Sequence, residues 1–66
     1  MRETLSDREL EVARLVHSGL TNPQIANQLV LSVHTVRCHV RNALGKMGFK
    51  NRVQLSLWFE RATEFR

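Results

Sequence analysis

The sequence predicts an all-α fold, a compact domain of four helices that contains a helix-turn-helix. Three observations predict it. Cap-like residues precede four apolar patterns of helical spacing, no segment has the alternation of a strand, and the linkers are two to four residues long. A chain of 66 residues has room for one domain. We therefore expect residues 1–66 to form a single domain with helices near 6–18, 22–30, 33–47 and 51–64.

The first helix is predicted over residues 6–18. Ser6 and Glu9 have the spacing of a capping box, in which each side chain bonds the backbone N–H of the other residue. Gly19 is expected to end the helix in a left-handed conformation. His17 falls on the apolar stripe of this helix, and we expect it to be a core residue with its hydrogen bonds satisfied. The rest of the stripe is Leu10, Val12, Ala13, Leu15 and Val16.

The second helix is predicted over residues 22–30. Thr21 and Gln24 form a second capping box, but Pro23 disfavours helical geometry at the residue before it. Asn22 is therefore an alternative N-cap, and the sequence leaves both open. The residues expected to be buried are Ile25, Ala26 and Leu29.

The third helix is predicted over residues 33–47, between a Ser32 cap and a Gly48 stop. At about 100° per residue, its apolar residues share one side. They are Val33, Val36, Val40, Ala43, Leu44 and Met47. The opposite side carries His34, Arg37, Cys38, Arg41 and Gly45, and one flank carries Thr35, His39, Asn42 and Lys46.

The fourth helix is predicted over residues 51–64, with Asn51 as a cap and Gln54 three residues later. One broad face carries Leu55, Trp58, Phe59, Ala62 and Phe65. Val53 and Leu57 lie on the other side. This helix is more apolar than one face against a small core requires, so we expect its second face to form an interface.

Composition narrows the class of protein. The single cysteine, Cys38, cannot form an internal disulfide, and the apolar runs are far shorter than the roughly 20 residues of a membrane span. The N-terminal residues lack the apolar core of a signal peptide. We expect a cytoplasmic protein that does not engage a membrane.

The charge is concentrated in the middle of the chain. The net charge is +4, and residues 12–59 contain no Asp or Glu. Without carboxylates, that segment projects a positive potential toward a polyanion such as nucleic acid. A solvated basic surface is the alternative explanation. The basic residues of the segment are Arg14, Arg37, Arg41, Lys46, Lys50 and Arg52.

Residues 21–47 carry the predicted function, because a short helix, a tight turn and a capped longer helix make a helix-turn-helix. The outward side of such a helix can read base edges in the major groove. Arg37 and Arg41 stand one turn apart, and each guanidinium could bond guanine O6 and N7. Cys38 and His34 lie between or beside them, and Cys38 could touch a thymine methyl. Phosphates could be held by Thr35, Asn42, Lys46 and the helix N-terminus at Ser32.

The chain resembles the LuxR-type (NarL/FixJ, GerE-like) DNA-binding domain over residues 5–59. The resemblance is carried by Leu5-Ser6-Asp7-Arg8-Glu9, Gly19-Leu20-Thr21-Asn22, Ile25-Ala26, Leu29, Ser32, Thr35-Val36-Arg37, His39-Val40, Asn42, Leu44, Lys46-Met47-Gly48 and Asn51-Arg52. It implies a four-helix output domain of a bacterial transcription regulator that binds promoter DNA as a homodimer on a two-fold site. It also implies attachment to a receiver or sensor domain, as in a response regulator.

The resemblance also assigns residues. It makes Arg37, Cys38 and Arg41 the base-facing residues of the third helix. It places Thr35, Asn42, Lys46 and the start of the second helix, at Asn22, near phosphates. It suggests homodimer contacts through the last helix, by Val53 and Leu57 and also by Trp58.

Three positions depart from the family pattern. Gly45 stands where a long, often basic residue is common, which removes a possible phosphate contact. Val30 occupies a turn position that many helix-turn-helix proteins give to Gly. Because a β-branched residue resists positive φ, we expect this turn to use another geometry. Ala13 is smaller than the leucine expected there.

The sequence gives little support for metal binding, cofactor binding or catalysis. His34 and Cys38 have metal-ligand spacing, but two ligands do not make a structural zinc site. We expect no cofactor, no metal and no enzymatic activity, since the carboxylates sit at helix starts and no phosphate-binding glycine loop is present. Two alternatives stay open. One is a sigma-factor promoter-recognition domain, and the other is a helical adaptor that docks on a protein such as RNA polymerase.

Overall fold

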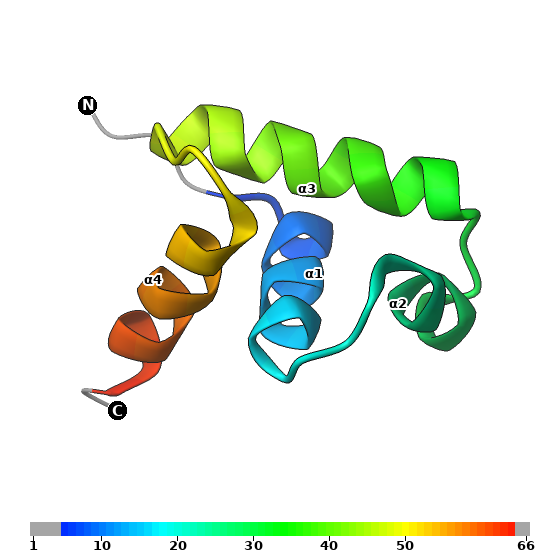
Figure 1. Ribbon diagram of the computed structural model, residues 1–66, viewed down its shortest axis with the longest axis horizontal. Helices are drawn as coiled ribbons and strands as arrows, with labels where there is room; N and C mark the ends of the chain where they lie inside the picture. Colours follow the sequence, from blue (N-terminus) through cyan, green and yellow to red (C-terminus); the bar gives the residue numbers. More distant parts are fainter. Residues whose placement is uncertain (1–4, 65–66) are drawn as a thin grey trace.

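The computed structural model describes residues 5–64, which form four α-helices and no β-strand (Figure 1). The helices are α1 (Asp7–His17), α2 (Asn22–Leu29), α3 (Val33–Met47) and α4 (Arg52–Glu64). Each end lies within one residue of the predicted range. Within residues 5–64, no helix is both long enough and apolar enough to cross a bilayer.

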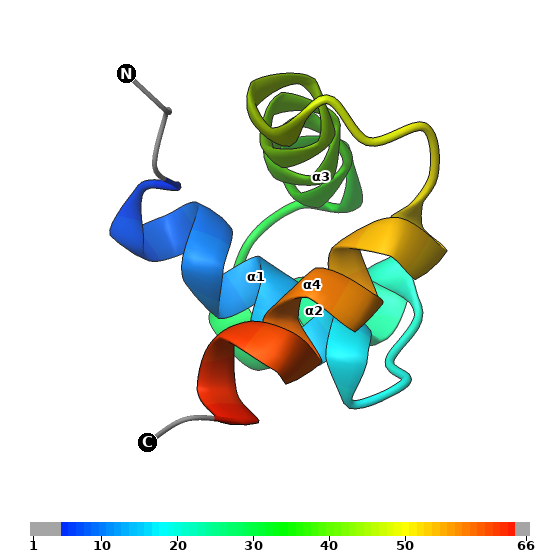
Figure 2. The same cartoon turned by 90° about the vertical axis from the view of Figure 1, so that its left-hand side faces the viewer.

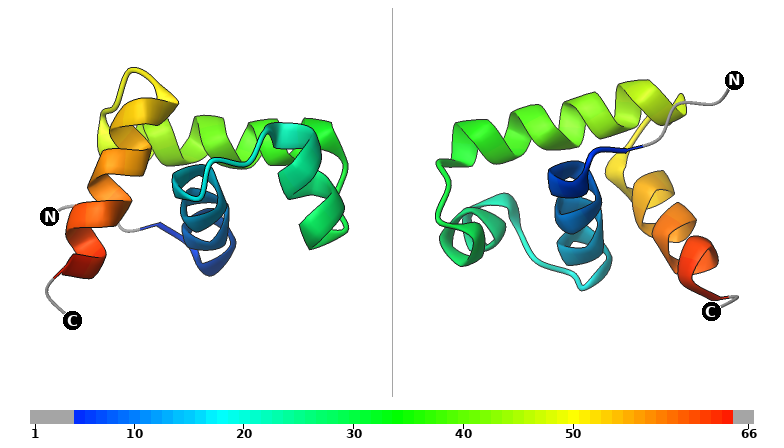
Figure 3. Two further views of the ribbon diagram at one scale, coloured as in Figure 1. Left: turned by 60° about the horizontal axis from the view of Figure 1, so that its bottom comes forward. Right: turned by 180° about the vertical axis from the view of Figure 1, so that it is seen from behind.

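The longest helix, α3, organises the molecule. It runs along one side, α1 packs against its middle, and α2 and α4 lie at its opposite ends (Figures 1 and 3). A view along α3 shows the other three helices gathered beneath it (Figure 2). One long side of α3 is therefore left uncovered by the other three helices.

The core has two parts that meet along α3. The first joins α1, α2 and α3 through Val12, Leu15, Val16, Ile25, Ala26, Val36 and Val40. The second joins α1, α3 and α4 through Leu5, Ala13, Ala43 and Leu55, with Met47, Phe49, Trp58 and Phe59 packed against it. Leu44 touches both parts. The small side chain of Ala26 lets α2 approach Val36 of α3, which lies in the same cluster.

The predicted caps account for the helix ends. Ser6 and Glu9 form the capping box of α1, with the Ser6 N–H donating to Glu9 Oε1 at 3.0 Å. Gly19 follows α1 with φ +91°. At the start of α2 the structure resolves the alternative in favour of Thr21, whose N–H donates to Gln24 Oε1 at 2.8 Å. Asn22 is the first residue of the helix, and its side chain is free for other contacts.

Val30 contradicts the expected turn geometry. It adopts the left-handed conformation, with φ 58° and ψ 50°, and its side chain is 88 % exposed. The next residue explains why. Leu31 packs against the first core cluster, and its N–H bonds the Ala26 carbonyl at 2.9 Å. A left-handed residue at position 30 is what turns the chain back for that contact, at a cost of about 1–2 kcal/mol for a non-glycine residue.

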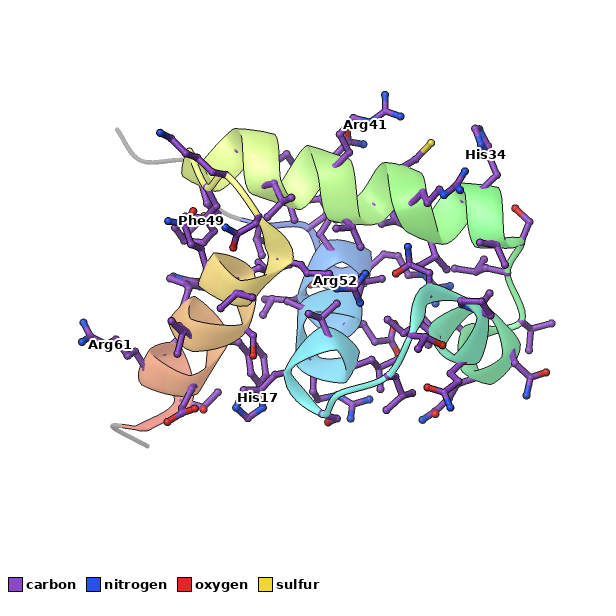
Figure 4. The ribbon with its side chains drawn as sticks, in the orientation of Figure 1. His17, His34, Arg41, Phe49, Arg52 and Arg61 are labelled. Atoms are coloured by element: carbon purple, nitrogen blue, oxygen red, sulfur yellow. The ribbon has the colours of Figure 1, made fainter. Side chains whose placement is uncertain are left out.

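His17 is also placed differently from the prediction. It is not a core residue, because Val16 takes the buried position at the end of α1 and His17 faces α4 at the surface. Its Nε2 lies 3.4 Å from Glu60 Oε1, and its ring centroid lies 5.5 Å from that of Phe59. Figure 4 shows His17 at the end of α1 farthest from α3. His17 occupies a position that the periodicity of α1 assigns to the apolar stripe, but its partner Glu60 lies on α4. The sequence pattern of α1 alone does not indicate that partner.

The fourth helix packs with only part of its predicted face. Leu55 is buried and Trp58 and Phe59 are half-buried, whereas Ala62 is exposed. Phe65, predicted on the same face, lies outside the described residues. Because α4 packs along α1 from one side, its Val53 and Leu57 are left open at 62 % and 56 % exposure.

Candidate nucleic-acid interface

The uncovered side of α3 carries the candidate interface. Ser32 begins the helix by accepting the Thr35 N–H at 3.1 Å, and the buried side chains of Val36, Val40 and Ala43 fix how the helix is rotated. This rotation leaves Arg37 and Arg41 exposed. Figure 4 shows Arg41 and His34 projecting from α3 on the side opposite α1.

Among the described residues, neither arginine has an acidic partner. Within residues 5–63, the ion pairs are Arg8–Glu11, His17–Glu60 and Lys46–Glu9. None of them involves Arg37 or Arg41, so both guanidinium groups keep all their donors available. An exposed helix side with two such groups one turn apart can bind a polyanion and make paired hydrogen bonds to a flat acceptor edge.

Cys38 and His34 share this side of α3. The Cys38 Sγ lies 3.7 Å from His34 Nε2, and the cysteine is half-buried. In the part of the chain that the structure describes, no group of three or more His, Cys, Asp or Glu side chains could hold a metal ion. The pair therefore contributes a small thiol and an imidazole to this surface, with Cys38 between the two arginines along the helix and His34 one turn before Cys38.

Ser32 and Thr35 lie together at the start of α3. Their hydroxyl oxygens are 2.9 Å apart, and either one can be the donor. Only one of the two hydroxyl protons is used in that bond. The other stays available to an acceptor approaching the N-terminal end of the helix.

Lys46 has a structural partner on another helix, which the local sequence pattern does not indicate. Its Nζ donates to Glu9 Oε1 at 2.8 Å, and the Glu9 side chain is only 7 % exposed. Burial raises the pKa of the Glu9 carboxyl, but the hydrogen bonds and charge of Lys46 and the bonds from Ser6 outweigh it. The pKa of Glu9 therefore lies below its ordinary value of 4.5. Lys46 ties the end of α3 to the start of α1, and its predicted phosphate contact stays a prediction.

Arg52 makes a second long-range contact, which the local sequence pattern does not indicate either. From the start of α4, its Nη1 donates to Asn22 Oδ1 at 2.7 Å and its Nη2 donates to the Leu20 carbonyl at 3.2 Å. Helical periodicity cannot reveal a contact between residues 30 positions apart. The only sequence signal for Arg52 is its place in the Asn51-Arg52 pair of the family pattern. That pattern does not indicate which residue Arg52 contacts.

The remaining predicted site residues lie at the edges of the surface. Asn42 is exposed on the flank of α3, and Gly45 faces open space. Asn22 lines a groove between the start of α2 and α3. The full lining of that groove is Leu20, Thr21, Asn22, Pro23, Val33, Arg37 and Arg52. Val53, Leu57 and the half-buried Trp58 are on α4, at the end of the molecule away from α2.

A family model described as "Bacterial regulatory proteins, luxR family" matches residues 3–59. The chain belongs to this family. Its predicted membership and its all-α helix-turn-helix fold are thereby confirmed. The family supplies the DNA-binding domain of transcription regulators, and the exposed basic side of α3 is the part of this member with the chemistry for that role.

Several curated relatives are named as response regulators. The chain is 44% identical over 57 residues to a nitrate/nitrite response regulator homolog of Haemophilus influenzae, which covers 86% of this chain and 27% of the relative. It is 42% identical over 55 residues to the nitrate/nitrite response regulator NarP of Escherichia coli, covering 83% of this chain and 26% of the relative. The chain thus spans about a quarter of the length of these relatives.

A solved structure has the same arrangement of helices. The response regulator ChrA of a heme-sensing two-component system matches with a TM-score of 0.82 and 32% sequence identity. The match covers 100% of this chain and 32% of the ChrA chain.

Proposed function

We propose that this chain is the sequence-specific DNA-binding output domain of a bacterial transcription regulator, with α3 in the major groove. The observation that carries the proposal is the pair of exposed arginines, Arg37 and Arg41, on a helix side where neither forms an ion pair with a described residue. Each guanidinium can donate two hydrogen bonds to guanine O6 and N7, which is worth about 1–3 kcal/mol of discrimination against a wrong base. Cys38 and His34 complete the base-facing set, Cys38 by contact with a thymine methyl.

Phosphate contacts come from groups with unused donors at the edge of the same surface. Lys46 has two N–H donors beyond the one bonded to Glu9, and the Asn22 amide has its NH₂ free because only its oxygen accepts from Arg52. The Ser32–Thr35 pair has one hydroxyl proton to donate. Asn42 completes this set from the flank of α3. Such contacts set the register of the domain on DNA, and the base contacts set its preference.

The whole protein is proposed to act as a homodimer. Two copies would meet through Val53 and Leu57 of α4, with Trp58 beside them, and would occupy two half-sites about one helical turn apart. The relatives are longer response regulators, so we propose a fused receiver or sensor domain, a location in the cytoplasm and, at promoters, contact with RNA polymerase.

Selection of bound duplexes from a random pool at physiological salt tests this function. The chain is compared with Arg37→Ala, Arg41→Ala and a matched control, Arg61→Ala, which removes an exposed arginine of α4 that points away from α3 (Figure 4). We expect an enriched motif for the unaltered chain and for the control, and a relaxed preference at one base pair for each α3 variant. A pool without enrichment would favour the adaptor function, in which the domain binds a protein and reads no DNA.

A further inference from the structure

Arg52 links two helices that do not otherwise meet. Among the described residues, α2 packs against α3 and to a smaller extent against α1, and it makes no packing contact with α4. The Arg52 side chain spans that gap in front of α1 (Figure 4). Its two terminal nitrogens bond two different acceptors, the Asn22 amide oxygen and the Leu20 carbonyl oxygen. A planar guanidinium can hold both at once because its donors form a fixed fork.

None of the first three residues of α2 is buried. The buried residues of this helix are Ile25 and Ala26, at and just after the end of its first turn. In the first turn, Pro23 and Gln24 are exposed and Asn22 is half-buried. The capping box of Thr21 is local. Within the part of the chain described, the side-chain hydrogen bonds that join this turn to a distant residue are those of Arg52.

Arg52 also lies between two surface features. On one side it lines the groove that contains Asn22, Val33 and Arg37. On the other it lines a hollow with Val16, Gly19, Leu20, Val53 and Ser56. Within residues 5–63, no carboxylate lies within ion-pair distance of Arg52. Because the acceptors of Arg52 are neutral, they do not cancel its positive charge. That charge favours binding of a phosphate backbone along the groove.

We propose that Arg52 is a positioning residue for DNA binding, which holds the first turn of α2 so that Asn22 and the helix start meet the phosphate backbone. The proposal rests on the proposed function. It assigns to Arg52 an effect that acts through α2 and requires the two-pronged fork, in contrast to a direct charge contact with DNA. These two roles predict different behaviour for a lysine, which keeps the charge and loses the fork.

The binding experiment compares Arg52→Met, Arg52→Lys, Asn22→Ala and the double variant Arg52→Met/Asn22→Ala. Lys50→Met is the matched control, because it removes a neighbouring exposed charge outside the fork. Affinity is measured on the selected duplex and on a random duplex over a series of salt concentrations. We expect Arg52→Met to weaken both by the same factor, on the order of tenfold, and to leave the log–log salt slope nearly unchanged, because the phosphate contacts that it loses come from neutral amide and backbone N–H groups. A slope lower by about one would instead indicate a direct charge contact of Arg52 with a phosphate.

Three outcomes of this series decide between the roles. Positioning predicts that Arg52→Lys behaves like Arg52→Met and that the double variant loses no more than either single variant. A direct charge contact predicts that Arg52→Lys binds like the unaltered chain. Additive losses in the double variant would mean that Arg52 and Asn22 act independently. Either of the last two results overturns the proposal.

Amide hydrogen exchange provides a readout that does not depend on DNA. In the unaltered chain, the Ile25 N–H donates to the Thr21 carbonyl at 2.9 Å and the Gln24 N–H to Thr21 Oγ1 at 3.4 Å. In Arg52→Met we expect these two amides to exchange faster, with the buried Val40 amide of α3 unchanged. Equal acceleration of all three amides would mean a general loss of stability and would refute the positioning role. If the unaltered chain binds no duplex, the proposed function fails, and the exchange result still decides whether Arg52 holds α2.

Discussion

The basic residues of α3 have two different environments. Arg37, in the first half of the helix, and Arg41, at its middle, are exposed and have no acidic partner among the described residues. Near the C-terminal end, Lys46 is bonded to the buried carboxylate of Glu9. The difference follows from rotation about the helix axis, because Arg41 lies on the uncovered side whereas Lys46 lies on the flank above the start of α1. A basic residue of α3 can therefore serve the fold, the proposed interface or both, depending on whether a carboxylate of another helix lies within its reach.

The largest expected effect comes from removing Lys46. In Lys46→Met, the Glu9 carboxylate stays buried with only its bonds from Ser6, so we expect the free energy of unfolding to fall by about 1–3 kcal/mol. Urea unfolding followed by circular dichroism measures the change. Adding Glu9→Gln removes the unmatched charge and should recover part of the loss. A single variant as stable as the unaltered chain would show that the pair does not support the fold.

DNA binding by the double variant Glu9→Gln/Lys46→Met tests whether Lys46 also contacts a phosphate. If Lys46 also contacts a phosphate, Glu9→Gln/Lys46→Met still binds all duplexes more weakly, with a salt slope lower by about one. If Lys46 serves the fold alone, the slope returns to that of the unaltered chain.

Removing Arg41 should have the opposite pattern. Because its side chain is exposed and unpaired, we expect Arg41→Ala to change the free energy of unfolding by less than about 0.5 kcal/mol. It should lower discrimination at one base pair by about 1–3 kcal/mol. Competition binding with single-base variants of the selected duplex measures this. Equal losses on specific and random duplexes would instead make Arg41 a phosphate contact.

The comparison also indicates what the sequence could predict. Capping boxes, glycine stops and helical spacing are local, and they placed every helix and the outward side of α3. The contacts of Lys46 with Glu9 and of Arg52 with Asn22 join residues 37 and 30 positions apart, so no local pattern contains them. The prediction that His17 is a core residue is wrong for the same reason, since its partner Glu60 is on another helix. The prediction that Val30 avoids positive φ is wrong because the packing of Leu31 against the core outweighs the local preference of a β-branched residue for negative φ.

Acid should weaken the Lys46 end of α3 selectively. The pKa of Glu9 is lower in the folded chain than its ordinary value of 4.5, so the pair contributes stability that is fully present above that value. The contribution is lost as the pH falls through the depressed folded pKa. We expect unfolding free energy, measured from pH 6 to about pH 2, to decline less steeply in Glu9→Gln than in the unaltered chain. Parallel pH curves for the two proteins would contradict this assignment.

The smallest expected effect concerns the turn that leads into the Arg37 end of α3. Val30 is left-handed and almost fully exposed, so Val30→Gly relieves the strain and loses little burial. The greater flexibility of glycine in the unfolded chain offsets part of the gain, and we expect a net stabilisation of about 0.5–1 kcal/mol. Val30→Ala is the control, because alanine keeps a Cβ and gains less. Unchanged DNA affinity in Val30→Gly would mean that the strained turn only connects the helices. A loss of affinity would mean that the restricted backbone at Val30 helps to set the angle between α2 and α3, and would make this turn part of the DNA-binding half of the molecule.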